Sequence, residues 1–279
     1  MSYAAKTRIL RILIYTVLIV LLIMCILPIW IMLINATRST AEIQQGISLI
    51  PGKNLLVNWK TLTGRGFSIM NGLLNSTVIS VSVTVLTVYF SMLFAYAIHV
   101  YDFSYKKFIY AFVVLLVLVP TQVSIIGFYR YMAAFKLTNS YIPLILPAIA
   151  APSAIFFAKQ YLEAVIVREL IDAARIDGCS EIGIFHRIML PIAKPGAFTL
   201  GIFAFVGSWN NFFTPFIMIS KMSKYTLPML VQTLRGDTYR TEYGSIYLGL
   251  AVSIIPIIIV YAIFSKYIVN GIAMGAVKE

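Results

Sequence analysis

Long runs of uncharged, mostly apolar residues alternate with short charged segments along this chain. Six runs of at least 22 residues contain no Asp, Glu, Lys or Arg: 12–37, 66–101, 108–129, 137–158, 195–220 and 243–265. A helix rises about 1.5 Å per residue, so each run can cross a hydrocarbon layer of roughly 30 Å. Backbone groups find no water in that layer, which leaves helices as the expected structure. The pattern predicts an all-α integral membrane protein with one transmembrane domain, 1–279, whose six helices cover 9–34, 70–99, 108–133, 139–161, 196–219 and 245–268.

The composition supports a membrane protein. Hydrophobic residues make up 60% of the chain and charged residues only 11%, too few to cover a soluble globule of this size. The formal net charge of +12 comes from basic residues scattered over loops and span ends. This distribution favours anionic membrane lipids as partners and argues against nucleic acid.

The charges before the first span predict the orientation. Lys6, Arg8 and Arg11 are basic and no acid accompanies them, which places the N-terminus in the cytoplasm by the positive-inside rule. The first apolar run is longer than a signal-peptide core, so we expect it to remain as a span. Six spans then bring both termini to the cytoplasmic side. The segment 162–195 becomes the one long cytoplasmic loop.

The predicted spans contain no Asp, Glu or Lys at mid-depth. Proton-coupled carriers depend on such groups, so a transporter without them is expected to draw its energy from elsewhere. An ATP-independent channel or a secondary carrier remains an alternative, because backbone carbonyls at broken helices can hold sodium. A membrane enzyme is a weaker one, since the spans show no nucleophile with a base, carboxylate pair or metal-ligand cluster.

The loop 162–195 carries a helical pattern of its own. An apolar face is expected from residues at i, i+3, i+4 and i+7: Val167, Leu170, Ile171 and Ala174. The opposite face holds residues spaced for ion pairs: Arg168, Asp172 and Arg175. Gly178 can end this helix, and Ser180 can cap a second one that runs to Pro191. Such a hairpin can serve as a docking surface, or it can lie against the membrane or its own spans.

The loop resembles the "EAA" loop of ABC-importer permeases. The residues that carry the resemblance are Asp172-Ala173-Ala174, Asp177-Gly178, Phe185, Pro191 and Pro195. Asp172 replaces the usual Glu, and Val167 stands where Pro is common. Over nearly the whole chain the resemblance is closest to the carbohydrate-uptake permeases of the maltose-transporter type, through Asn75-Ser76, Ala95-Tyr96-Ala97, 119–122, Ser208-Trp209-Asn210 and 271–278. Gly127 departs from a frequent Pro.

The resemblance implies the six-helix architecture of a type I ABC-importer permease in the bacterial cytoplasmic (inner) membrane. Its expected partners are a second, different permease subunit, two copies of a cytoplasmic ATPase, and an extracytoplasmic sugar-binding protein. The chain has no GxxxxGK[ST] phosphate-binding loop, so we expect ATP hydrolysis on separate subunits. We expect this chain not to be an enzyme and to hold no cofactor or metal. ATP and Mg²⁺ would bind the ATPases. The coupling loop would dock on an ATPase through Glu169, Leu170, Asp172, Ala173, Ala174, Asp177, Gly178 and Phe185.

A polar and aromatic cluster in the fifth predicted span is the candidate sugar contact. It comprises Trp209, Asn210, Asn211 and Phe212, with Tyr129 from the third span as a further pathway candidate. An amide can bridge sugar hydroxyls and an aromatic face can stack on a sugar ring. The alternative is structural, because Trp belongs to interfacial belts and Asn often bonds between helices.

Overall fold

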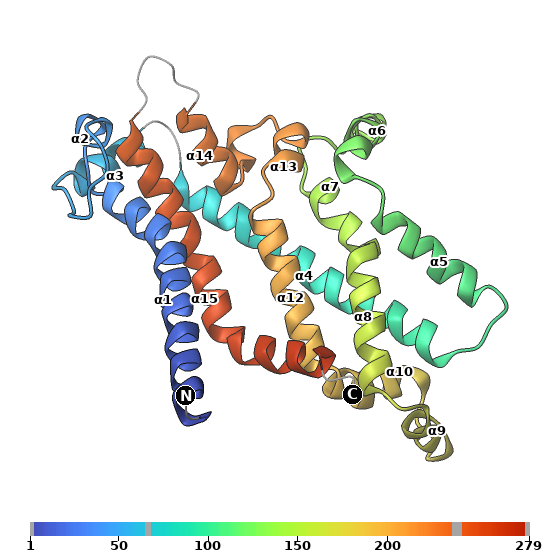
Figure 1. The fold of residues 1–279 in the computed structure, drawn as a ribbon. Helices are drawn as coiled ribbons and strands as arrows, with labels where there is room; N and C mark the ends of the chain where they lie inside the picture. The colour runs from blue at the N-terminus through green and yellow to red at the C-terminus, as the bar shows by residue number, and fades with distance from the viewer. Residues whose placement is uncertain (1–2, 65–67, 236–241, 277–279) are drawn as a thin grey trace. The chain divides into compact units, whose positions relative to one another are not determined.

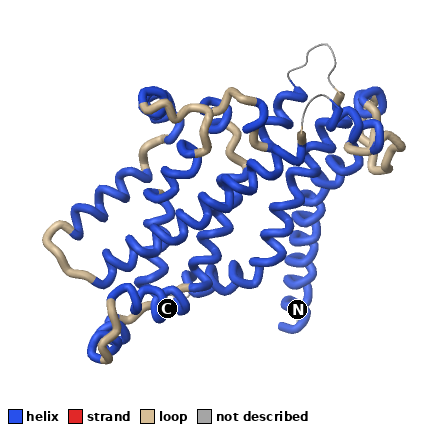
Figure 2. Tube along the Cα trace, turned by 180° about the vertical axis from the view of Figure 1, so that it is seen from behind, coloured by secondary structure: helices blue, strands red, loops and turns tan. Residues whose placement is uncertain are grey.

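The computed structural model describes residues 3–64, 68–235 and 242–276, which form helices joined by loops without strands (Figures 1 and 2). The elements are α1 (Tyr3–Asn35), α2 (Thr40–Gln44), α3 (Leu55–Gly64), α4 (Ile69–Val100), α5 (Lys106–Val117), α6 (Thr121–Ala134), α7 (Ile142–Ile145), the 3₁₀-helix η1 (Leu146–Ala150), α8 (Pro152–Val165), α9 (Arg168–Ile176), α10 (Glu181–Ile184), the π-helix η2 (Phe185–Met189), α11 (Leu190–Ile192), α12 (Lys194–Trp209), α13 (Phe213–Met218), the 3₁₀-helix η3 (Met222–Lys224), α14 (Leu227–Arg235) and α15 (Tyr243–Ala276). The segment 271–278, which carries part of the family resemblance, extends beyond Ala276, the last described residue.

Four described helices are long and apolar enough to cross a membrane unaided: Thr7–Asn35, Ile69–Val100, Ile142–Val165 and Tyr243–Ser265. Two bent pairs bring the number to six if each is one span: Lys106–Val117 with Gln122–Ala134, and Glu181–Ile192 with Lys194–Trp209. The predicted all-α membrane fold is confirmed, with between four and six spans in the described residues.

The predicted span 108–133 is interrupted in the structure, because α5 ends at Val117 and α6 begins at Thr121. Pro120 explains the break. It has no N–H to donate, and it pushes the residue before it toward an extended conformation. Pro120 itself is extended, with φ −64° and ψ 121°, at the start of α6.

The predicted span 196–219 is also divided, since α12 ends at Trp209 and α13 begins at Phe213. Pro215 cannot donate a hydrogen bond to the carbonyl of Asn211, and the two adjacent asparagine amides compete with backbone pairing. With 16 residues, α12 is about 24 Å long, shorter than a typical hydrocarbon layer.

The chain forms two compact units, 1–69 with 230–255 and 70–229 with 256–279. In the first, α1 exposes large apolar side chains from Ile9 to Leu33. The same unit also contains a buried cation, because Arg38 is only 8% exposed. Its guanidinium donates to the side-chain oxygen of Asn35 at 3.1 Å, to the carbonyl of Gly46 at 2.9 Å, and to the carbonyl of Glu42. Carbonyl and amide oxygens thus compensate for the charge's lost hydration.

The second unit holds a large core, in which the spans and the loop 162–195 share one set of buried side chains. It includes Met92 and Tyr96 of α4, Ala158 and Leu162 of α8, and Ile171, Ala174, Ile184 and Phe185 of the loop. Figure 1 shows α9 and α10 beyond the end of α8. The loop is therefore packed onto its spans and is not an independent surface segment.

Several serine and threonine side chains of α4 are buried between helices. Ser76, Ser80, Thr87 and Ser91 are each 6% exposed or less. The hydroxyl of Ser76 accepts a hydrogen bond from the backbone N–H of Leu227 at 2.8 Å. Small hydroxyl residues let helices approach closely, which fits their burial here.

Candidate functional site

The first loop helix, α9, buries only half of its predicted apolar face. Ile171 and Ala174 are 1% and 5% exposed and point into the core shared with α4 and α8. Val167 and Leu170 are exposed, so only part of the predicted apolar face is covered by the spans. Helical spacing identifies residues on a common side, but it does not fix how wide the covered stripe is. Leu170 belongs to the free surface of the loop.

Gly178 ends α9 as the sequence predicts. Its φ is +79°, in the left-handed region that favours glycine. The N–H of Gly178 donates to the carbonyl of Arg175 and the N–H of Cys179 to that of Ala174, both at 3.0 Å. These two bonds form a Schellman motif, which satisfies carbonyls left open at a helix end. The turn reverses the chain between α9 and α10.

Ser180 caps α10, also as predicted. Its hydroxyl accepts a hydrogen bond from the backbone N–H of Gly183 at 3.2 Å. The side chain thereby satisfies one of the N–H groups that lack an intrahelical partner in a first turn. Gly178 and Ser180 together define a hairpin of two short helices.

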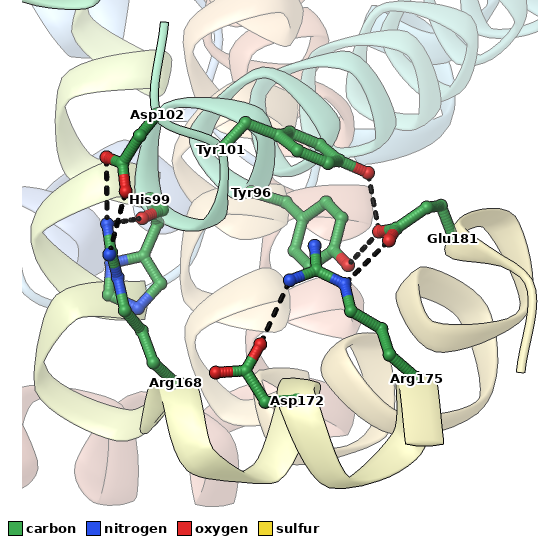
Figure 3. A network of polar contacts seen from close by, with 8 residues as sticks. All are labelled: Tyr96, His99, Tyr101, Asp102, Arg168, Asp172, Arg175 and Glu181. Carbon is green, nitrogen blue, oxygen red and sulfur yellow. Dashed lines mark hydrogen bonds and ion pairs between the residues drawn. The ribbon is translucent and has the colours of Figure 1, made fainter. Parts of the chain in front are cut away.

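Two carboxylates outside the predicted motif tie this hairpin to the end of α4 (Figure 3). Asp102 forms a bidentate pair with Arg168, with N–O distances of 3.0 and 3.2 Å. Glu181 accepts from Arg175 at 2.7 Å and from the hydroxyl of Tyr101 at 2.5 Å. Sequence analysis missed Asp102, Tyr101 and Glu181 because they are adjacent to the loop's basic residues only after folding.

The ion pairs on α9 differ in part from those that spacing predicts. Arg175 does pair with Asp172, at 3.0 Å. Arg168 turns instead to Asp102, and the hydrogen bonds from Arg168 and Lys106 lower the pKa of Asp102 to about 2. This pair therefore favours the folded state at pH above the ordinary aspartate pKa. Its contribution decreases progressively as pH falls below the ordinary aspartate pKa, and it is lost once pH has fallen through the folded-state pKa of about 2.

Two residues of the predicted docking set lie inside the protein. Ala174 is 5% exposed, and Phe185 is 1% exposed with its ring against Tyr96 at a centroid distance of 5.6 Å. Neither offers surface to a partner, so their part is to hold the hairpin against α4 and α8. The exposed members of the set are Glu169, Leu170, Asp172, Ala173, Asp177 and Gly178.

The free face of the hairpin also carries two isoleucines that sequence analysis missed. Ile176 is 87% exposed and Ile182 is 74% exposed, one on each side of the Gly178 turn. Exposed apolar side chains beside small and acidic residues are typical of an interface. Both could have been recognised in the sequence, because each lies off the buried face of the hairpin and close to the Gly178 turn.

The polar and aromatic cluster of the fifth predicted span lies at the break between α12 and α13. Trp209 is 1% exposed and stacks on Phe205 at 5.6 Å, so it packs within the protein. Asn210 and Asn211 are exposed, and the side-chain oxygen of Asn211 accepts from the N–H of Thr214 at 3.2 Å. Phe212 is half-buried and stacks on Phe216.

Tyr129, the pathway candidate on α6, is 40% exposed. Its neighbour Phe128 packs against the same cluster as Phe212, which also contains Met132 and Met218. The structure therefore places α6 beside the α12–α13 break. Asn210, Asn211 and Tyr129 are the exposed candidates of this region.

Comparisons with known proteins agree with this architecture. Residues 90–274, more than half of the chain, match the family described as "Binding-protein-dependent transport system inner membrane component". The arabinooligosaccharides transport system permease protein AraQ of Halalkalibacterium halodurans is 38% identical over 73% of this chain and 72% of its own. AraQ of Bacillus subtilis is 33% identical, over 90% of each chain.

A solved structure shares the fold over almost the full length. It is a bacterial ABC transporter described as involved in the import of the acidic polysaccharide alginate, with a TM-score of 0.82 and 20% identity. The match covers 96% of this chain and 99% of that chain. The described helices therefore have the arrangement of an ABC-importer permease.

The fold and these comparisons define a transmembrane transport subunit. The chain belongs to the family of binding-protein-dependent transport system inner membrane components. It is a multi-pass inner membrane permease of an ABC importer and not an enzyme, because ATP hydrolysis in such importers resides on a separate subunit. The family as a whole works with a partner permease, an ATPase and a binding protein.

Proposed function

We propose that this chain forms half of the translocation pathway of an oligosaccharide importer and docks a cytoplasmic ATPase through the α9–α10 hairpin. The observation that carries the proposal is the asymmetry of the hairpin. One face is packed into the core of the spans, and the other is free and bears Leu170, Ile176 and Ile182. Because one face of the hairpin is packed against the spans, movement of a partner bound to the other face can be transmitted to the spans.

The cargo proposal rests on the AraQ relatives, whose names specify arabinooligosaccharides. The exposed amides at the α12–α13 break supply the hydrogen-bonding groups that sugar hydroxyls require. The complete importer would contain this chain, a different second permease, two ATPase subunits and an extracytoplasmic sugar-binding protein. Both termini would lie in the cytoplasm. ATP and Mg²⁺ would bind the ATPases, and this chain would hold no cofactor or metal.

The test is reconstitution. The complex purified through a tag on this chain should contain an ATPase and a second permease, and should import oligosaccharides into proteoliposomes only with ATP and the binding protein. A panel of mono- and oligosaccharides then defines the cargo. Uptake at the same rate without ATP would overturn the proposal in favour of an ATP-independent channel or carrier.

Replacing Asn210 should impair transport without impairing assembly. The Asn210 side chain is exposed at the helix break, so Asn210→Ala removes hydrogen-bonding groups without opening a cavity. Loss of one neutral hydrogen bond is worth about 0.5–1.5 kcal/mol, so we expect uptake to fall by roughly two- to tenfold. The measurement is sugar uptake at low substrate concentration, with the amount of assembled complex determined in parallel.

Two variants control this prediction. Gln45→Ala removes another exposed amide, in the first unit, and should leave uptake unchanged. Trp209→Ala opens a cavity at a buried ring, so it should reduce the amount of assembled complex together with uptake. If Asn210→Ala also loses assembly in proportion to uptake, its role is packing and not sugar contact.

A further inference from the structure

One carboxylate, that of Glu181, joins three parts of the second unit (Figure 3). Its Oε1 accepts from Nε of Arg175 on α9 at 2.7 Å. Its Oε2 accepts from the hydroxyl of Tyr101, just beyond α4, at 2.5 Å and from that of Tyr96, within α4, at 3.2 Å. Glu181 therefore connects both helices of the hairpin to the end of a long span.

The contacts around Glu181 fix the rotation of α10 as well as its position. Glu181 and Phe185 are four residues apart and so share one face. Tyr96 meets both, since its hydroxyl donates to Glu181 and its ring lies against Phe185 at 5.6 Å. A polar and an apolar contact on the same tyrosine resist both sliding and rolling of α10 on α4.

The free face of the hairpin is rigidly connected to this point. Arg175 bridges Asp172 on the exposed side of α9 and Glu181 at the start of α10. The Schellman turn at Gly178 closes the backbone between them. A force applied to the exposed side of α9 can therefore reach Glu181 through the Arg175 side chain and the hydrogen-bonded turn.

The other carboxylate pair at the end of α4, between Arg168 and Asp102, is weaker because it is more exposed to solvent. Its side chains are 50% and 71% exposed, so water and salt screen their attraction. Arg175 and Glu181 are 34% and 42% exposed, and Tyr96 is 3% exposed. Of the two carboxylates that join the hairpin to the end of α4, Glu181 is thus the more enclosed.

We propose that Glu181 is a positioning residue that makes α4 follow the hairpin when a docked ATPase moves it. This rests on the proposed function, because it requires an ATPase on the hairpin. Without the Glu181 contacts the hairpin still folds through its apolar core and still presents its free face. It then shifts relative to α4, so ATP is hydrolysed without a matching movement of the pathway.

The test compares two conservative variants in the complete reconstituted importer. Glu181→Gln keeps the size of the side chain and removes its charge. Tyr101→Phe keeps the ring and removes only the hydroxyl that donates to Glu181. We measure ATP hydrolysed per sugar imported and the ATPase retained by the complex. We expect unchanged ATPase content and a rise of at least about fivefold in ATP consumed per sugar, the lower end of typical coupling between sites.

Further variants separate this role from a general loss of charge. Glu163→Gln is a matched control, since Glu163 is also 42% exposed and pairs with Lys159 on α8 at 2.5 Å. Its ratio of ATP to sugar should equal that of the wild-type importer. In the double variant of Glu181 and Tyr101, the rise in ATP consumed per sugar should be smaller than the product of the two single effects, because Glu181→Gln weakens the bond whose donor Tyr101→Phe removes.

If the Glu181→Gln importer hydrolyses as much ATP per sugar imported as the wild type, the proposal is wrong. Loss of the ATPase from Glu181→Gln and Tyr101→Phe complexes also overturns it, since Glu181 would then maintain the docking surface itself. Failure of the proposed function is distinguishable, because the wild-type complex would then contain no ATPase before any residue is changed.

Discussion

Gly178→Val should leave the protein in the membrane at a normal level while abolishing most ATP-driven uptake. A β-branched residue in the left-handed conformation at φ +79° costs about 1–2 kcal/mol. No heavy atom lies within 4 Å of an added Cβ, so the cost comes from the backbone and not from a clash with a neighbour. The chain can relieve it only by changing the turn, which displaces Ile176 and Ile182 from their arrangement on the free face.

The measurement for Gly178→Val is the ATPase content of the complex and the stimulation of its activity by sugar-loaded binding protein. We expect both to fall, and uptake to drop by about tenfold or more, since 1.4 kcal/mol corresponds to a factor of about ten. Gly178→Asn is the control, because Asn tolerates the left-handed region far better. Normal transport by Gly178→Val, or its disappearance from the membrane, would show that the turn does not set the docking surface.

Gly196→Ala should sharply reduce the amount of folded protein, although it adds only one methyl group. A Cβ at Gly196 would lie 2.5 Å from Cε1 and 2.6 Å from Cγ of Tyr161. Both residues are buried where α12 meets α8, so the ring has no room to withdraw. Overpacking of this kind costs about 1–3 kcal/mol, and close contact between membrane helices depends on such small residues.

Thermal unfolding and membrane abundance measure the effect of Gly196→Ala. The matched control is Gly201→Ala on the same helix, where the new Cβ would meet Val88 and Thr84 at ordinary distances of 3.5 and 3.6 Å. That control should be as stable as the wild type. Adding Tyr161→Ala to Gly196→Ala should recover part of the loss, because it removes the ring that causes the clash. Equal stability of the Gly196 and Gly201 variants would contradict this account.

The sequence predicts the class of fold and the local chemistry of the loop well. Charge-free runs locate the spans because hydrocarbon thickness sets a minimum length. The Gly178 turn and the Ser180 cap are predictable because each depends on the conformation of one residue and its near neighbours. These are local signals, and they are confirmed.

The features that sequence analysis missed depend on tertiary structure. Helices apolar on all sides give no periodic signal of which side is buried, so the pattern does not reveal that Trp209 is packed inside the protein. The breaks at Pro120 and Asn210–Phe212 are visible as residues, but proline is tolerated in many membrane helices. The bonds from Tyr96 and Tyr101 to Glu181 span at least 80 sequence positions, and no spacing rule connects them.

The shared core of loop and spans limits how this subunit can exchange parts with its relatives. Residues 162–195 form one continuous segment in the sequence, but this segment contacts residues at the end of α4: Tyr96, Tyr101 and Asp102. A hairpin transplanted from another permease would bring its own exposed surface, but it would not be matched to the residues of α4 that it must contact. If the hairpin docks an ATPase as proposed, a chimera that is to keep that specificity must therefore transfer both distant segments together.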